Sequence, residues 1–253
     1  MKQILFSFFV GFFSFTFAQT SPSAFHGHWL SRNYVEALLK TQSPYKIQGK
    51  FEAMTEFVFL PELKDSVMIN FEDSEGATYP IMFTSATAAY AINAFSKERL
   101  DFEIKTVMDT VKVLTCYDSQ GQATEYLYFQ GKEKAFTGVK NLLNEVLFAG
   151  SYRKFMEMNV RTRGLEQVKF YTNGKIEGLV GFDRYEVLTH FDDIANFDVM
   201  KLTNSKNKQS LWKGWEIKGN KLIIYDLEKG EEYDYKKAEI FLQLDMEKQV
   251  EKN

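Results

Sequence analysis

Short stretches of alternating apolar and polar residues dominate the first half of the chain. Such alternation turns every second side chain to one face and is typical of strands that are buried on one side. The stretches predict six strands, at residues 51–60, 67–71, 79–83, 100–104, 111–117 and 124–129. Residues 86–94 fit a strand or a helical turn equally well. We therefore predict a mainly β fold of antiparallel meanders.

The second half repeats this style and adds two hairpin signals. Asn and Gly accept a positive φ angle, so their pairs between apolar runs favour tight turns. The pairs are Asn173-Gly174, between runs 168–171 and 176–180, and Gly219-Asn220, between runs 215–217 and 222–225. This half is therefore also predicted to be an antiparallel meander.

Two segments have helical periodicity. Ser31 can cap a first helix, which Ser43-Pro44 would end. A second amphipathic helix is predicted at residues 139–148, after Gly138. The apolar positions are Tyr34, Val35, Leu38 and Leu39 in the first helix, and Val139, Leu142, Leu143, Val146 and Leu147 in the second.

A similar sequence block occurs in each half. Residues 117–128 and 225–235 both read Tyr-Asp, a glycine turn and then Glu-Tyr-x-Tyr. A glycine also stands two residues before an aromatic residue in Gly27-His28-Trp29 and in Gly150-Ser151-Tyr152. A tandem duplication or ordinary hairpin composition would explain these blocks. We predict two β-barrel-like units, at residues 19–138 and 149–253, joined by the helix at 139–148.

Residues 1–18 have the pattern of a removable export signal. Lys2 supplies a positive charge, residues 4–17 are an apolar run, and small residues precede a cut after Ala18. This run is shorter than the ~20 residues that an α-helix needs to cross a bilayer. We predict cleavage near Ala18, a periplasmic or extracellular location, and no transmembrane segment in the mature chain.

Composition and charge exclude several classes of protein. With 45% hydrophobic and 26% charged residues, the chain has the composition of a packed globular protein. Its formal net charge of −3 argues against a nucleic-acid partner. Cys116 is the single cysteine, which excludes an intrachain disulfide, and its position in a strand predicts a buried, unreactive thiol.

The segment Phe25-His26-Gly27-His28-Trp29, followed by a strand meander, resembles the opening of the lipocalin and calycin families. In those barrels the glycine permits a close approach and the tryptophan closes one end. The later family signatures are not recognisable, and a helix directly after the Trp29 strand is unusual for the family. The resemblance implies small antiparallel barrels, whose interior is either filled or open to one small ligand.

This resemblance makes binding of a small apolar ligand the leading functional prediction. Aromatic residues form 16% of the chain, and such residues fill β cores as well as line apolar pockets. We predict a ligand site at Trp29, Phe57, Phe59 and Phe83. One alternative is a non-catalytic scaffold or accessory protein that binds a cell-surface protein partner. A third is a secreted glycosidase-type hydrolase, with carboxylates brought together from distant strands.

No catalytic or cofactor-binding motif is recognisable, so an enzyme is less favoured and no cofactor is expected. His26 and His28 are placed on one strand face and could supply two metal ligands, with His190 or its acidic neighbours as further donors. We expect both instead to be exposed histidines near the N-terminus.

Three polar segments are expected to be solvated. The carboxylates of Glu72, Asp73 and Glu75, and of Asp192 and Asp193, lack the spacing of a calcium loop and suit turns. The basic segment 201–213 is predicted to be a solvent-exposed hairpin loop.

Overall fold

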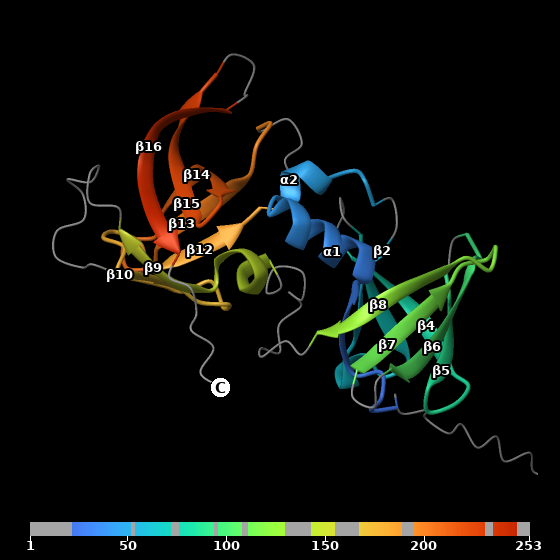
Figure 1. Cartoon of the computed structure of the whole chain (residues 1–253). Coiled ribbons are helices and arrows are strands. Elements are labelled where there is room, and N and C mark those ends of the chain that lie inside the picture. Colours follow the sequence, from blue (N-terminus) through green and yellow to red (C-terminus); the bar gives the residue numbers. More distant parts are fainter. Residues whose placement is uncertain are drawn as a thin grey trace, which may run out of the picture.

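The structure, a computed structural model, describes residues 22–51, 54–71, 76–93, 96–107, 111–129, 143–154, 167–188, 195–230 and 235–246. Its strands form two eight-stranded antiparallel sheets, one after the other along the chain (Figure 1). The mainly β fold with two barrel-like units is therefore confirmed.

The first eight strands close into a barrel in which neighbours along the chain are neighbours in the sheet. The ring closes where the first strand pairs with the eighth, with Trp29 opposite Tyr128. All six predicted strands are present, and the ambiguous segment 86–94 contains a seventh. The strands are β1 (Gly27–Ser31), β2 (Met54–Phe59), β3 (Ser66–Phe71), β4 (Ala77–Phe83), β5 (Ala88–Ile92), β6 (Arg99–Val107), β7 (Val111–Tyr117) and β8 (Ala123–Phe129).

The second sheet follows the same meander but closes less completely. Its first strand, β9, pairs with its last, β16, whereas β11 and β12 are linked by the isolated bridge Lys175–Arg184. The strands are β9 (Gly150–Lys154), β10 (Gln167–Phe170), β11 (Ile176–Glu177), β12 (Arg184–Val187), β13 (Val199–Asn204), β14 (Gln209–Lys218), β15 (Lys221–Lys229) and β16 (Tyr235–Met246).

The hairpins predicted around Asn173-Gly174 and Gly219-Asn220 connect β10 to β11 and β14 to β15. Residues 201–213 form a hairpin, and residues 205–212 are exposed, as predicted. The loop itself is limited to residues 205–208, because the other residues of the segment belong to β13 and β14, which pair from Val199 with Gly214 to Asn204 with Gln209. The alternation of these two strands is hard to recognise in the sequence, because the residues near the turn and on the outer face of the hairpin are mostly polar.

Helical segments lie beside the sheets. The predicted first helix is α1 (Arg32–Thr41), although the Ser31 side chain makes no capping hydrogen bond. A further turn, α2 (Pro44–Ile47), follows it and is capped by Ser43. Of the predicted helix at 139–148, the structure describes the short π-helix η2 (Asn144–Phe148). A 3₁₀ turn, η1 (Pro61–Leu63), connects β2 to β3. None of the helices in these ranges is long and apolar enough to cross a membrane.

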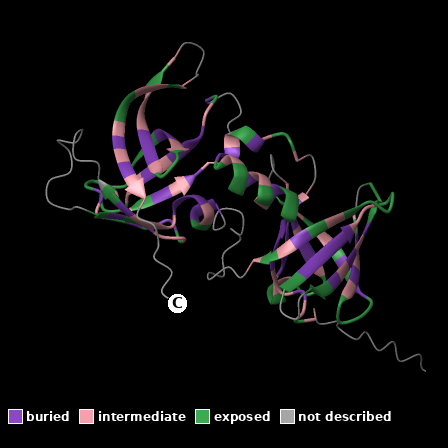
Figure 2. Cartoon of the chain, in the orientation of Figure 1, coloured by how far each residue is buried: buried purple, intermediate pink, exposed green. Residues whose placement is uncertain are grey.

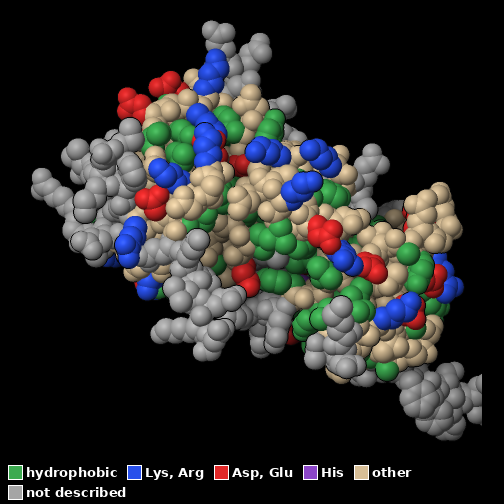
Figure 3. Space-filling model, viewed as in Figure 1, with side chains coloured by type: hydrophobic (Ala, Val, Ile, Leu, Met, Phe, Trp, Pro, Cys, Tyr) green, Lys and Arg blue, Asp and Glu red, His purple; other side chains and the backbone are tan. Residues whose placement is uncertain are grey.

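Large rings fill the interior of the first barrel. The Phe57 ring lies 4.9 Å from the Phe102 ring and 4.6 Å from the Tyr126 ring, measured between centroids. Edge-to-face contacts of this kind stabilise a core beyond the burial of area alone. Buried positions alternate with more open ones along β3 to β6, whereas β1, β2 and β7 contain runs of buried residues (Figure 2). On the face seen in Figure 3, acidic and basic side chains are interspersed, in keeping with the small net charge.

The helices α1 and α2, inserted between β1 and β2, lie between the two sheets (Figure 1). Leu38 and Ile47 from these helices are buried in one cluster with Trp215 and other interior side chains of the second sheet. The Tyr45 backbone N–H donates a hydrogen bond of 2.8 Å to Oδ1 of Asp198, which precedes β13. The helical insertion of the first half is thus bound to the second.

The Asp198 carboxyl is an acid-sensitive part of this contact. Burial raises its pKa above the ordinary value, more than the hydrogen bonds from Ser43 and Tyr45 and the nearby Lys237 and Lys46 lower it. The folded protein therefore holds a proton on Asp198 at pH values where the unfolded chain has lost it. Stability from this group falls as pH rises through the interval between the two pKa values.

We predict that Asp198→Asn and wild type are equally stable below this interval and that the variant is more stable above it. The amide keeps an acceptor for Tyr45 and carries no charge. Asp198→Ala removes the acceptor, so its free energy of unfolding is expected to be about 1–3 kcal/mol lower than that of Asp198→Asn, both below and above the interval. Urea unfolding at pH 3, below the ordinary pKa of an aspartate, and at pH 7 measures these differences. A wild-type protein more stable than Asp198→Asn at pH 7 would contradict the prediction.

Candidate functional site

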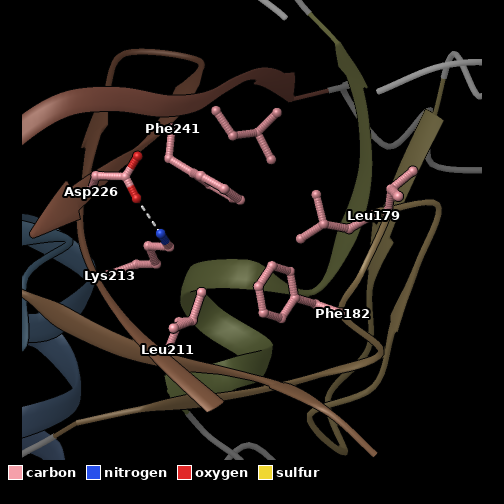
Figure 4. A pocket seen from close by; sticks show the side chains of 8 residues that line it. Leu179, Phe182, Leu211, Lys213, Asp226 and Phe241 are labelled. Carbon is pink, nitrogen blue, oxygen red and sulfur yellow. Dashed lines mark hydrogen bonds and ion pairs between the residues drawn. The ribbon is translucent and has the colours of Figure 1, made fainter. Parts of the chain in front are cut away.

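A cavity of about 430 Å³ opens in the interior of the second sheet. Six of the side chains that line it are apolar, and they surround the space in Figure 4 with η2 behind them. The size is within the range of pockets that hold small molecules. The apolar lining consists of Leu179, Val180, Phe182, Leu211, Phe241 and Leu242.

Half of this apolar lining comes from the loop between β11 and β12. Gly178 and Gly181 have φ angles of +81° and +87°, which residues other than glycine rarely adopt. A Cβ atom on Gly178 would lie 2.1 Å from the Gln167 carbonyl oxygen. The two glycines therefore allow this tight loop, which places Leu179 and Phe182 in the lining of the cavity.

Two charged residues also line the cavity. Lys213 of β14 and Asp226 of β15 form an ion pair on the inner surface of the sheet (Figure 4). Lys213 is 4% exposed, because it shares the inward parity of Trp215 in the same strand. The Asp226 side chain is more open, at 36%.

The Lys213 ammonium lies 4.1 Å from the centre of the Phe241 ring. A cation over an aromatic face is stabilised by the ring quadrupole, and the carboxylate supplies the opposite charge. Both contacts offset the cost of taking an ammonium out of water. The sequence analysis did not predict this pair. The one indication in the sequence is that Lys213 lies two positions before Trp215, so both side chains face the same side of the strand.

The core beside η2 has polar atoms of its own. Trp215 packs on Phe148 of η2, with ring centroids 4.7 Å apart. Trp215 Nε1 and Asn144 Oδ1 are buried without a hydrogen-bond partner among the described residues. Such atoms are rare in native cores.

The predicted ligand residues lie in the first barrel. Trp29, Phe57 and Phe59 are at most 1% exposed and Phe83 is 6% exposed. Phe25 packs on Phe59 and Phe83, at 5.2 and 5.3 Å between centroids. The structure thus brings these four residues together in one packed interior, separate from the cavity of the second sheet. Their role in ligand binding stays a prediction.

The expectation that both candidate histidines are exposed is wrong for His28. Its side chain is buried on the outer surface of the first barrel, where Nδ1 lies 2.7 Å from Oε1 of Glu56. The other carboxylate oxygen of Glu56 accepts a 2.7 Å hydrogen bond from Asn70. The partners are 28 and 14 positions apart in the sequence, so only strand pairing reveals the network.

A metal centre at these histidines has no support among the described residues. His26 is partly buried, and no group of three His, Cys, Asp or Glu side chains in those ranges could hold an ion. The further donors that the sequence offered, His190, Asp192 and Asp193, lie outside the described residues, as do Glu72, Asp73 and Glu75.

Cys116 is buried in the first barrel, as predicted. Burial raises the pKa of its thiol to about 12, so the thiolate is a minor species at neutral pH. This thiol is therefore unsuited to nucleophilic chemistry.

Comparison of the chain with protein families, with curated proteins and with solved structures found no match. A functional assignment therefore depends on the chemistry of the cavity and its surroundings.

We predict that Glu56→Ala lowers the free energy of unfolding by about 2–4 kcal/mol, because His28 and Asn70 lose a buried acceptor. Glu125, whose exposed carboxylate pairs with Arg32 at 2.9 Å, provides the matched control. Glu125→Ala should leave stability almost unchanged. Guanidinium unfolding measures both variants, and equal losses would show that the buried network contributes no more than a surface ion pair.

Proposed function

We propose that the protein is an exported, lipocalin-like binding protein that holds a small apolar ligand in the second sheet. The cavity of about 430 Å³, with six apolar side chains around it, is the observation that carries the proposal. An apolar ligand would replace water there and bury its own surface at the same time. The pattern of residues 1–18 supports export to the periplasm or the cell exterior.

In this proposal the two sheets have different roles. The first barrel is packed with aromatic side chains and supplies helices α1 and α2, which complete the core of the second unit. The second sheet keeps a cavity, which Leu179 and Phe182 line from the loop between β11 and β12. We infer that the first unit supports the second, which binds the ligand.

Binding is better supported than hydrolysis. The buried carboxylates of the described residues are Glu56 and Asp198, which lie in different units. Each has hydrogen-bond partners within the protein. Glycosidase chemistry needs two carboxyl groups on either side of one bond, and this pair does not provide them.

We predict that the neutral dye N-phenyl-1-naphthylamine binds the protein with enhanced fluorescence and that Leu179→Trp weakens this binding at least ten-fold. The larger ring would occupy space that the dye needs. Leu39→Trp is the control, because Leu39 is 56% exposed on α1 and lies away from the cavity lining. A fluorescence titration measures all three proteins.

A wild-type protein that does not bind the dye would contradict the proposed function. Unchanged binding by Leu179→Trp would place the ligand outside the second sheet. In that case the first-barrel residues Trp29, Phe57, Phe59 and Phe83 would be the next to substitute.

A further inference from the structure

We propose that the ligand carries a neutral hydroxyl group, which binds against the Lys213–Asp226 pair. This inference rests on the proposed function, because it assumes that the cavity holds a ligand. It adds the chemical class: an apolar alcohol rather than a fatty acid, an amine or a simple hydrocarbon.

The first step is the hydrogen-bonding capacity of the pair. A lysine ammonium has three N–H donors, and a carboxylate has two acceptor oxygens. Among the described residues, Lys213 has one hydrogen-bond partner, Oδ1 of Asp226, and Asp226 has no other. Donors of a nearly buried ammonium and an acceptor oxygen therefore remain available on the wall of the cavity.

The second step is charge. The ammonium and the carboxylate already compensate each other, so the site has no net charge to offer a ligand. A ligand carboxylate would lie beside Asp226, and a ligand ammonium beside Lys213; both place like charges together in a poorly solvated space. A hydrocarbon would bring no charge but would cover the Lys213 donors without satisfying them.

A hydroxyl group meets both requirements. It accepts a hydrogen bond from the Lys213 ammonium and donates one to the free oxygen of Asp226. The pair lies on β14 and β15, whereas Leu179 and Phe182 line the cavity from the loop after β11. The alcohol would therefore point its hydroxyl to the β14–β15 wall and its apolar body to this loop.

Competition between the dye and four ligands of equal chain length tests the inference. The ligands are decan-1-ol, decyl methyl ether, decanoate and decylamine, each titrated at pH 7 against the bound N-phenyl-1-naphthylamine. The ether accepts a hydrogen bond but cannot donate one to Asp226. We expect decan-1-ol to bind about ten-fold tighter than each of the others, as a hydrogen bond to a charged group allows.

The double variant Lys213→Met/Asp226→Leu separates this effect from folding. Lys213 is buried and Asp226 partly so. Replacing both members of such an ion pair by apolar residues of similar size generally preserves stability, whereas removing one leaves the other charge without a partner. The variant should still bind the dye and should bind decan-1-ol no tighter than the ether. Lys175→Met/Glu177→Leu is the control, because this second ion pair is exposed and the cavity lining does not include it. It should keep the full preference for the alcohol.

The other outcomes overturn the inference in distinguishable ways. Decanoate or decylamine binding as tightly as decan-1-ol would show that the site does not select against a charged ligand. Equal binding of alcohol and ether, or an alcohol preference that survives in the double variant, would show that the pair does not recognise a hydroxyl, although the cavity still binds ligands. A wild-type protein that binds neither dye nor ligand would overturn the proposed function together with the inference.

Discussion

The limited interior of an eight-stranded barrel is the constraint on which the rest of this structure depends. Eight strands enclose a space that large side chains just fill, so the choice of inward-facing residues decides between a solid core and a pocket. In the first barrel, Trp29, Phe57 and Phe102 fill this space. In the second sheet, the loop between β11 and β12, with glycines at positions 178 and 181, lines a cavity instead.

The same hydrogen-bond pattern occurs at the start of both units. Trp29 Nε1 donates a hydrogen bond of 2.8 Å to the Phe25 carbonyl, and the Tyr152 hydroxyl donates one of 2.9 Å to the Phe148 carbonyl, also four residues earlier. Gly27 and Gly150 stand at the same place in this pattern, both with positive φ. A Cβ on Gly27 would lie 2.6 Å from the Tyr128 ring. The first of the related sequence blocks connects β7 to β8; the second begins in β15 and ends at Tyr235, the first residue of β16, and its residues 231–234 lie outside the described residues. This common plan favours duplication over chance.

Local pattern was sufficient to predict most strands, because alternation and turn residues act over a few positions. The contacts that give the site its chemistry depend on pairing across the sheets. Nothing near His28 in the sequence indicates Glu56 as its partner, and the polar surroundings of Lys213 suggested a solvated loop. The cavity was harder still to foresee, since it depends on the summed volumes of many inward side chains. The resemblance of residues 25–29 to the opening of a barrel therefore directed the predicted ligand site to the first barrel.

A cavity lowers stability, because the side chains around it lose contacts that a filled core would make. The second sheet bears this cost together with a weak closure between β11 and β12. Helices α1 and α2 offset part of it, since Leu38 and Ile47 extend the buried cluster around Trp215. The Asp198 contact with Tyr45 holds these helices at the second sheet. The fully packed first barrel thus anchors the helices that complete the core of the second sheet.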